Sequence, residues 1–295
     1  MSQSSIDIDA LIGDIDRIPD LPIVAFRVNR MLNDSNINAI DLSRVISLDT
    51  GLTTKILRLC NSSAYGLSRK IATVKEAITI LGMKELRQIM FTIISRGILN
   101  RPFEGYALDK NALWENAIVC ASCAKVLAEK ARFMDKDLVF TAALLRDIGK
   151  LALDTSLQKK FNNIEQTAIR DQLSFEQAES KTIGFSHTEA GAKLAEKWSL
   201  PDALRLTIRY HHRPSEIPDE TELMIKRLVA LVHLADCFTM MLGVGVGSDG
   251  LMYTMDMKAL DILGFKADDL NDLYISVLDQ PETVRETLES LENAL

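Results

Sequence analysis

Charged residues stand in the middle of an apolar stretch, AALLRDIGKLAL, at residues 142–153. Asp147 has the side chain of a divalent-cation ligand, whereas Arg146 beside it offers no lone pair and stays protonated. A carboxylate buried in an apolar helix costs free energy unless it is paired, hydrogen-bonded or bound to a metal. The stretch therefore predicts a cationic partner for Asp147, and the same argument applies to Asp236 in LVHLADCF.

The chain has only four histidines, and they follow this stretch in a suggestive order. His187 opens a helical pattern, His211 and His212 close another, and His233 lies one turn before Asp236. Imidazole and carboxylate together are ligands for zinc, iron or manganese. A single histidine is usually a core or surface residue, but this order indicates one shared site. The alternative is that the two aspartates reach the surface or close structural ion pairs.

Composition and charge exclude several classes of function. The 295 residues are 47% hydrophobic and 25% charged, as in ordinary soluble globular proteins. Residues 254–295 hold ten acidic and three basic residues, which account for the whole net charge of −7. No concentrated basic face is evident, so nucleic-acid binding is not expected. The start lacks a signal-peptide pattern, and the apolar runs are too short for a membrane span. The four cysteines do not have the spacing of a disulfide framework. We therefore expect a cytoplasmic protein.

The local signals are helical nearly throughout. Three capping-box patterns predict helix starts, namely Thr73 with Glu76, Ser174 with Gln177, and Ser186 with Glu189. Residues 137–153 and 223–242 are apolar nearly all round, which is typical of helices at the centre of a bundle. No alternating strand pattern is found. The predicted fold class is all-α.

The motifs together resemble the HDOD domain, the HD-related output domain of bacterial signalling proteins and a degenerate member of the HD superfamily of metal-dependent phosphohydrolases. The resemblance covers roughly residues 10–240 and rests on quoted stretches: IPDLPIVAFRVNRMLND, NSSAYG, IATVKEAITILGMKELRQIMF, DIGK, HH and AD. It implies a multi-helix bundle with an N-terminal helical subdomain at 1–105 and a degenerate HD-like bundle at 106–240.

Two further segments are predicted beyond the resemblance. Residues 241–253 contain glycines at dinucleotide-fingerprint spacing, but no strand precedes them, so they are interpreted as a flexible Gly-rich linker. Residues 254–295 form an acidic C-terminal extension with apolar positions at helical spacing. Its helices either pack back on the core or bind another protein. Packing back is favoured because isolated short helices are marginally stable in water.

The resemblance can be carried over position by position. An active HD site uses a histidine on the helix that contains LWENAIVCA and a second histidine in the His-Asp dyad. This chain has Asn116 and Arg146 at those two positions. The other positions match the pattern: Asp147, His187, His211, His212 and Asp236. Lys150 either holds a phosphate group or reaches solvent at a helix end.

The substitution by Arg146 argues against a metal. Like unit charges about 4 Å apart at an effective dielectric near 20 repel by roughly 4 kcal/mol, and a divalent ion doubles that figure. No metal or other cofactor is therefore expected, and the guanidinium would instead bind Asp147, Asp236 or both in a bidentate way. In the rival arrangement the Arg146 side chain turns away, and a divalent metal binds four ligands: Asp147, His187, His211 and Asp236.

These expectations define two functions. The first is a non-catalytic bacterial signal-transduction output or adaptor protein that acts through protein–protein contacts. Its partners would be signalling proteins such as a sensor kinase or a cyclic-nucleotide enzyme, not nucleic acid or membrane, and self-association into a homo-oligomer is left open. The alternative is a metal-dependent phosphohydrolase or cyclic-dinucleotide phosphodiesterase, which would require a metal to generate hydroxide.

Overall fold

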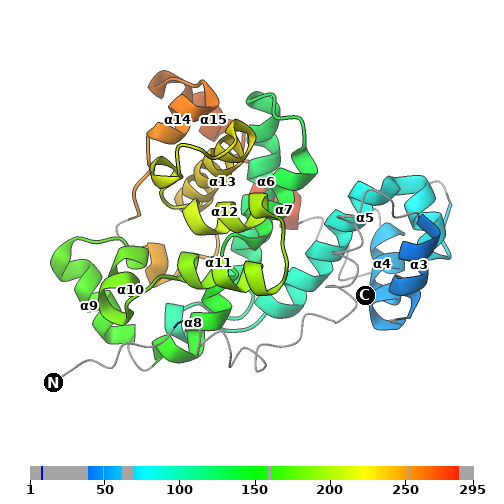
Figure 1. The fold of residues 1–295 in the computed structure, drawn as a ribbon, viewed down its shortest axis with the longest axis horizontal. Helices are drawn as coiled ribbons and strands as arrows, with labels where there is room; N and C mark the ends of the chain where they lie inside the picture. The colour runs from blue at the N-terminus through cyan, green and yellow to red at the C-terminus, as the bar shows by residue number, and fades with distance from the viewer. Residues whose placement is uncertain are drawn as a thin grey trace. The chain divides into compact units, whose positions relative to one another are not determined.

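The computed structural model describes residues 8, 39–48, 50–61, 69–158, 161–250 and 253–285. Regular structure in these ranges is helical, with one isolated β-bridge between Phe103 and Leu108 (Figure 1). The all-α prediction is confirmed. The stretch IPDLPIVAFRVNRMLND, most of NSSAYG and the last ten residues of the acidic extension lie outside the described residues.

The chain divides into two compact units, and each is described by itself. One comprises Met1–Pro19 and Leu99–Leu278, and the other comprises Asp20–Ile98 and Asp279–Leu295. The domain boundaries expected at residues 105, 240 and 253 stay predictions.

The second unit contains α3 (Ala39–Ser47), α4 (Thr50–Cys60) and most of α5 (Val74–Leu99). Its core consists of aliphatic side chains from the three helices, including Ile46, Ile56 and Ile89. Thr73 Oγ1 accepts a hydrogen bond from the Glu76 N–H at the start of α5, as predicted, but the Glu76 carboxylate accepts from the Ala72 N–H, so the capping box is not the reciprocal one expected. Gly82 has a φ of 85°, so α5 consists of two helical stretches joined at a break.

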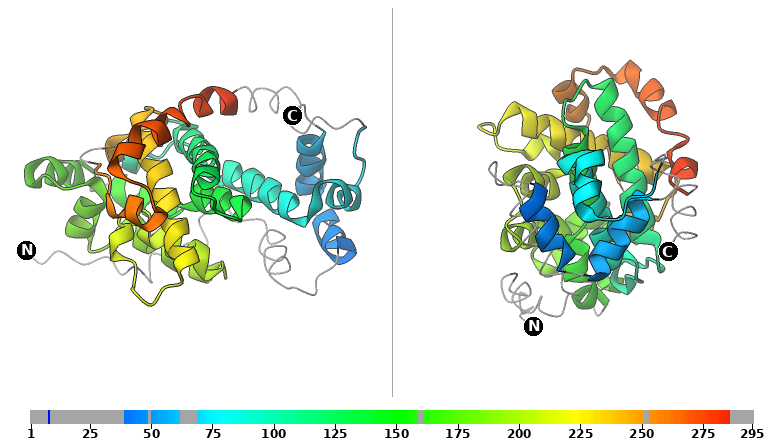
Figure 2. Two further views of the ribbon diagram at one scale, coloured as in Figure 1. Left: turned by 90° about the horizontal axis from the view of Figure 1, so that it is seen from above. Right: turned by 90° about the vertical axis from the view of Figure 1, so that its right-hand side faces the viewer.

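The first unit is built around three helices that pack side by side, α6 (Ala112–Lys130), α7 (Lys136–Leu145) and α13 (Leu223–Met241) (Figures 1 and 2). Every residue of α13 from Leu228 to Thr239 is buried, as predicted for a helix at the centre of the bundle, while its two ends are exposed. Around these helices lie α8 (Gly149–Gln158), α9 (Phe161–Asp171), α10 (Phe175–Ile183), α11 (His187–Lys197) and α12 (Asp202–Tyr210). In the described part of this unit, four single 3₁₀ turns lie between the helices: η3 (Glu104–Tyr106), η4 (Pro214–Glu216), η5 (Ser248–Gly250) and η6 (Ala267–Asp269).

The capping box at the start of α11 fixes the position of His187, a predicted site residue. Ser186 accepts a hydrogen bond from the Glu189 N–H, and the Glu189 side chain accepts one from the Ser186 N–H. Ser174 and Gln177 form the same reciprocal pair at α10. Both predicted capping boxes are confirmed, and the first residue of α11 is His187.

The apolar stretch 137–153 is not one helix. It breaks at residues 146–148 into α7 and α8, where the Ile148 N–H bonds the Leu145 carbonyl and the Lys150 N–H bonds the Asp147 carbonyl across three residues. This tight turn gives Arg146 and Asp147 a corner position. Both side chains are buried there despite their charge.

The first two helices of the C-terminal extension pack on the bundle. α14 (Lys258–Leu263) lies against α13, and Tyr274 in α15 (Leu270–Ile275) places its ring 5.4 Å from that of Phe238. The packed-back interpretation agrees with this part of the extension.

A close backbone approach joins α8 to α11. A Cβ atom added to Gly149 would lie 1.8 Å from the His187 carbonyl oxygen and 2.5 Å from the Gly191 nitrogen. Real Cβ atoms do not approach backbone atoms so closely, and backbone cannot rotate aside as a side chain can. Glycine at 149 therefore permits the contact that brings the Asp147 corner next to His187.

The substitution Gly149→Ala is expected to destabilise the protein by about 3 kcal/mol, because α8 and α11 must separate to admit the methyl group. Urea denaturation followed by circular dichroism measures this. Gly97→Ala is the matched control, since an added Cβ there meets no atom within 4 Å. It should stabilise by about 0.5–1 kcal/mol through helix propensity. Equal effects at the two positions would contradict the packing argument.

Candidate functional site

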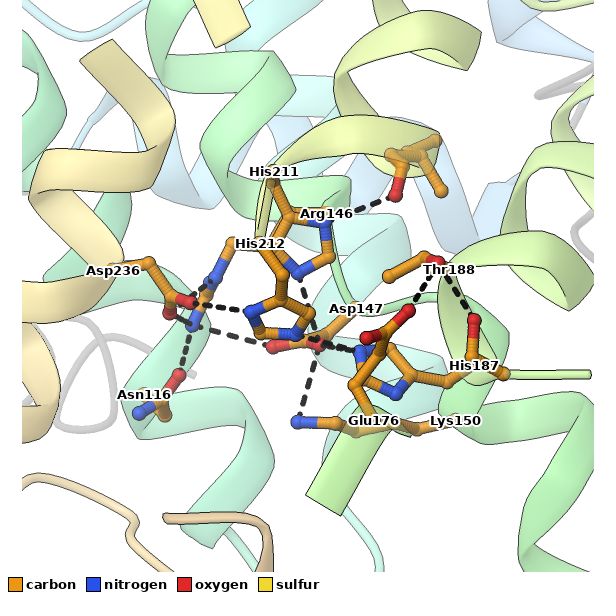
Figure 3. A network of polar contacts seen from close by, with 12 residues as sticks. Asn116, Arg146, Asp147, Lys150, Glu176, His187, Thr188, His211, His212 and Asp236 are labelled. Carbon is orange, nitrogen blue, oxygen red and sulfur yellow. Dashed lines mark hydrogen bonds and ion pairs between the residues drawn. The ribbon is translucent and has the colours of Figure 1, made fainter. Parts of the chain in front are cut away.

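The first unit contains a polar pocket with a volume of about 60 Å³, which is room for a few waters or one ion. Seven of the eight predicted site residues line it: Asn116, Arg146, Asp147, Lys150, His187, His212 and Asp236. The eighth, His211, lies directly behind, with Nε2 3.8 Å from Asp147 Oδ1. The structure thus brings all eight residues together (Figure 3). His233 is not among them, because its Nδ1 bonds the His211 carbonyl and its Nε2 accepts from the Asp256 N–H.

Arg146 does not turn away from the pocket. Its Nε and Nη2 each lie 2.7 Å from Asp236 Oδ1, and its Nη1 donates to the Ala143 carbonyl at 3.1 Å. Nη2 also donates to Asn116 Oδ1 and lies 3.3 Å from Asp147 Oδ2. Burial lowers the pKa of Arg146, but the surrounding acidic groups, Asp236 foremost and Asp147 among them, together outweigh burial and raise the pKa. The guanidinium therefore holds both aspartates. It bonds one oxygen of Asp236 instead of the two expected in a bidentate pair.

Asn116 orients the guanidinium. Its Oδ1 accepts from Arg146, and its Nδ2 donates to the Val244 carbonyl at 2.8 Å. The stretch expected to be a flexible linker thereby contacts the start of α6. A Cβ on Gly245 would lie 2.1 Å from the Ala112 carbonyl oxygen. The amide of Asn116 is engaged at both ends and takes the place of the metal-binding imidazole that the family resemblance implied.

Asp147 lies between the basic residues and the histidines. Lys150 Nζ is 3.1 Å from its Oδ1, and His187 Nε2 is 3.5 Å from the same oxygen. Neither contact has hydrogen-bond geometry, so Oδ1 is buried without a hydrogen-bond partner. Burial raises the pKa of Asp147, but Lys150 and Arg146 outweigh it and hold the pKa well below its usual range. The residue is therefore a carboxylate with an oxygen available for a further cation.

The three pocket imidazoles are each held through Nδ1. His187 Nδ1 bonds Glu179 Oε2 at 2.7 Å, and His211 Nδ1 bonds the Ile208 carbonyl at 3.0 Å. His212 Nδ1 lies 3.1 Å from the hydroxyl of Tyr253. Such contacts on one ring nitrogen leave the other nitrogen to bind a metal.

Four residues of the pocket fit a cation-binding site that lies away from the guanidinium of Arg146. Asp147, His187, His211 and His212 each offer one ligand atom, and the four atoms lie within 4.8 Å of one another. Two of them, Asp147 Oδ1 and His211 Nε2, are buried without hydrogen-bond partners. Three nitrogens and one carboxylate oxygen suit zinc, iron or manganese. The group differs from the predicted metal ligands in one member, because His212 stands in it and Asp236 does not.

A proton competes with a cation for this place. Burial lowers the pKa of His211 to about 4 and that of His212 well below its usual range, so both are neutral near pH 7. Burial also lowers the pKa of His187, but the Glu179 carboxylate outweighs it and the pKa is raised. His187 Nε2 is 3.0 Å from His212 Nε2. A protonated His187 can therefore donate a hydrogen bond to His212.

Glu179 and Tyr253 are site residues that sequence reasoning missed, as is Tyr106, the partner of Glu179. Glu179 is fully buried and bonds both His187 and the hydroxyl of Tyr106, whose oxygen lies 2.8 Å from Glu179 Oε1. Tyr253 bonds His212 and Asp236. No spacing or motif pointed to them, because each meets its partner only through tertiary packing. The residues around Glu179 in the sequence give no local sign that its carboxylate is buried.

The fold and the pocket define an all-helical protein of HD-like architecture with a buried arginine at the dyad. A family model, the HDOD domain, matches residues 18–214. The chain therefore belongs to the HDOD family, and the predicted resemblance is confirmed.

Solved structures share the fold. An HDOD domain protein of unknown function from Geobacter sulfurreducens is 25% identical with a TM-score of 0.64, covering 92% of this chain and 96% of that one. A candidate signal transduction protein from Marinobacter aquaeolei VT8 is 19% identical with a TM-score of 0.72, covering 99% and 68%. A candidate phosphohydrolase from Shewanella amazonensis SB2B is 20% identical with a TM-score of 0.65, covering 92% and 97%.

A curated relative is longer than this chain. An uncharacterized protein of Treponema pallidum (strain Nichols) is 24% identical over 226 residues, which are 75% of this chain and 42% of that protein. Among the described residues, no helix combines the length and apolar character that a bilayer crossing requires.

Replacing Arg146 with alanine is expected to cost about 3–5 kcal/mol, because Asp236 and Asp147 would remain buried without the guanidinium. Chemical denaturation measures the loss. Arg205→Ala is the matched control, since Arg205 pairs with an exposed Asp202 and should contribute less than about 1 kcal/mol. A loss of that small size for Arg146→Ala would show that the buried ion pair is not needed for folding.

The histidines predict how stability depends on pH in metal-free protein. Between pH 6.5 and about 4, unfolded His211 takes up a proton that folded His211 refuses, so the free energy of unfolding falls as pH falls. From pH 6.5 to 5 this amounts to about 2 kcal/mol for one histidine. His212 acts in the same direction, while the raised pKa of His187 acts in the opposite one.

Denaturation at pH 7 and pH 5 tests this. His211→Asn should show a smaller loss of stability at pH 5 than the natural chain. An equal loss in both proteins would assign the effect to other groups.

Proposed function

We propose that this HDOD protein is a bacterial signal-transduction output or adaptor protein that acts through protein–protein contacts and not through turnover. The observation that carries the proposal is the buried guanidinium of Arg146, which bonds Asp236 and Asn116 at the position of the dyad histidine. The pocket is then an ionic centre that stabilises the bundle, and the protein is a pseudoenzyme.

The positive charge of Arg146 and the engagement of both Asp236 oxygens support this proposal. Asp236 Oδ1 accepts from Arg146, and its Oδ2 accepts from Tyr253, so neither oxygen is free to bind a metal. A divalent cation about 4 Å from the guanidinium would meet a repulsion of roughly 8 kcal/mol at an effective dielectric near 20. Phosphoester hydrolysis by HD-type proteins depends on a metal to activate water. This side of the pocket offers no such centre.

Family membership supports the signalling role. HDOD means an HD-related output domain, and one protein of the same fold is a candidate signal transduction protein. The partners we propose are signalling proteins such as a sensor kinase or a cyclic-nucleotide enzyme, in the cytoplasm of a bacterium, with self-association left open.

A second candidate function is favoured by the group of Asp147, His187, His211 and His212. A divalent ion held by these residues would supply a Lewis acid and an activated water, as in a metal-dependent phosphohydrolase or cyclic-dinucleotide phosphodiesterase. Another protein of this fold is a candidate phosphohydrolase. Lys150 lies at the same place and would neutralise a phosphate oxygen. A cavity of about 60 Å³ is too small for a nucleotide unless the pocket opens.

Elemental analysis separates the two functions. The natural chain is expected to purify with well under one transition metal per molecule, and Arg146→His is expected to bring the metal content toward one. The reason is that the variant exchanges a repelling charge for a lone pair. Asp147→Asn in the Arg146→His background is the control and should return the content to the natural level.

Stoichiometric metal in the natural chain would contradict the first proposal. So would hydrolysis of phosphodiesters with added manganese or iron, provided that the activity disappears in Asp147→Ala. If the natural chain shows no turnover and binds no metal, the second proposal is contradicted.

A further inference from the structure

Tyr253 is a pocket residue that lies outside the part matched by the family model. It is the last residue of the Gly-rich stretch and precedes α14, whereas the HDOD match ends at residue 214. Its side chain nevertheless lines the pocket. Its ring stands edge-on to that of His212, with 5.2 Å between the centroids.

The hydroxyl of Tyr253 bridges two residues that perform different tasks. It donates to Asp236 Oδ2 at 2.5 Å, and it lies 3.1 Å from His212 Nδ1. Asp236 belongs to the ion pair with Arg146, and His212 belongs to the group of three imidazoles. Tyr253 thus links the ionic side of the pocket to its histidine side through hydrogen bonds, in addition to the contact of Asp147 with Arg146.

The positions of the protons follow from this bridge. A phenol has one proton, and an ionised carboxylate can only accept, so the proton of Tyr253 lies toward Asp236. The thiol of Cys237 also approaches the hydroxyl, but a neutral sulfur is a weaker acceptor than a carboxylate. The oxygen of Tyr253 must therefore accept from His212, whose Nδ1 carries the hydrogen. The Nε2 of His212 keeps its lone pair and faces His187 Nε2 at 3.0 Å.

The backbone around Tyr253 is anchored on the same helices. The Asp256 N–H donates to His233 Nε2 at 2.8 Å, and Asp256 Oδ2 accepts from the Ser215 N–H at 2.8 Å. These bonds attach the segment before α14 to α13 and to the turn after α12. The hydroxyl is consequently placed next to His212 by a segment whose backbone is fixed by these two hydrogen bonds.

We propose that Tyr253 is a positioning residue. Its hydroxyl accepts a hydrogen bond from Nδ1 of His212 and so keeps that ring in the Nδ1–H tautomer, in which the lone pair on Nε2 faces His187. The end of the Gly-rich stretch thereby completes the pocket. This inference holds for the metal-free chain and depends on neither of the two proposed functions.

Nitrogen-15 NMR of the histidine rings tests the proposal directly, and four histidines make the spectrum easy to assign by single substitutions. In the natural chain at neutral pH, His212 should carry its hydrogen on Nδ1. Tyr253→Phe keeps the ring and removes the hydroxyl, so His212 should shift toward the Nε2–H tautomer. His211 and His233 should not change, because their Nδ1 atoms bond backbone carbonyls.

Tyr274→Phe is the matched control, since Tyr274 lies in the C-terminal extension that follows Tyr253, packs on Phe238 and is not among the residues that line the pocket. It should leave all four histidine signals in place. A hydrogen on Nε2 of His212 in the natural chain would overturn the proposal, and so would an unchanged His212 signal in Tyr253→Phe.

A second readout rests on the cation-binding candidate function. Cobalt(II), followed by visible absorption, should bind Tyr253→Phe about 10–100-fold more weakly than the natural chain. Equal affinity would count against the positioning role. A natural chain that binds no cobalt would contradict the cation-binding function alone, because the NMR result decides the tautomer without a metal.

Discussion

A buried arginine paired with a buried aspartate is the constraint on which the rest of the pocket depends. Removing two charges from water costs several kcal/mol per ion, and the mutual attraction offsets this only when the remaining donors are satisfied. Arg146 meets that condition, since Nε, Nη1 and Nη2 each have an acceptor in Asp236, Ala143 or Asn116. Asn116 and Asp236 are consequently engaged as partners of the guanidinium.

The pocket has two sides with different electrostatic character. On the arginine side, positive and negative groups neutralise one another and leave no ligand atom free. On the histidine side, Asp147 Oδ1 and His211 Nε2 have no hydrogen-bond partner, and two neutral imidazoles face a third that Glu179 renders more basic. Lys150 provides positive charge there without a metal, and His187 adds to it when its ring is protonated. Tyr253 connects the two sides through one hydroxyl, so a change on either side reaches the other.

Much of the fold followed from local signals. The capping residues at Thr73, Ser174 and Ser186 start helices where expected, because a cap acts through hydrogen bonds within one turn. The continuous apolar character of α13 predicted its burial. The break at residues 146–148 escaped prediction, since the apolar pattern runs through it and no glycine or proline marks it before Gly149. Glu179 and Tyr253 escaped as well, because their partners are distant in the chain.

The sequence by itself determined the helical class, the family and the exchange of histidine for Arg146, because these depend on residue types and short-range periodicity. Only the tertiary structure decided which oxygen of Asp236 the guanidinium bonds and that His212 joins the histidine group in place of Asp236. The physical reason is distance. Arg146 and Asp236 are 90 residues apart in the chain, and a contact of 2.7 Å between them is set by how α7 and α13 pack. No local preference for helix or turn specifies a separation of that kind.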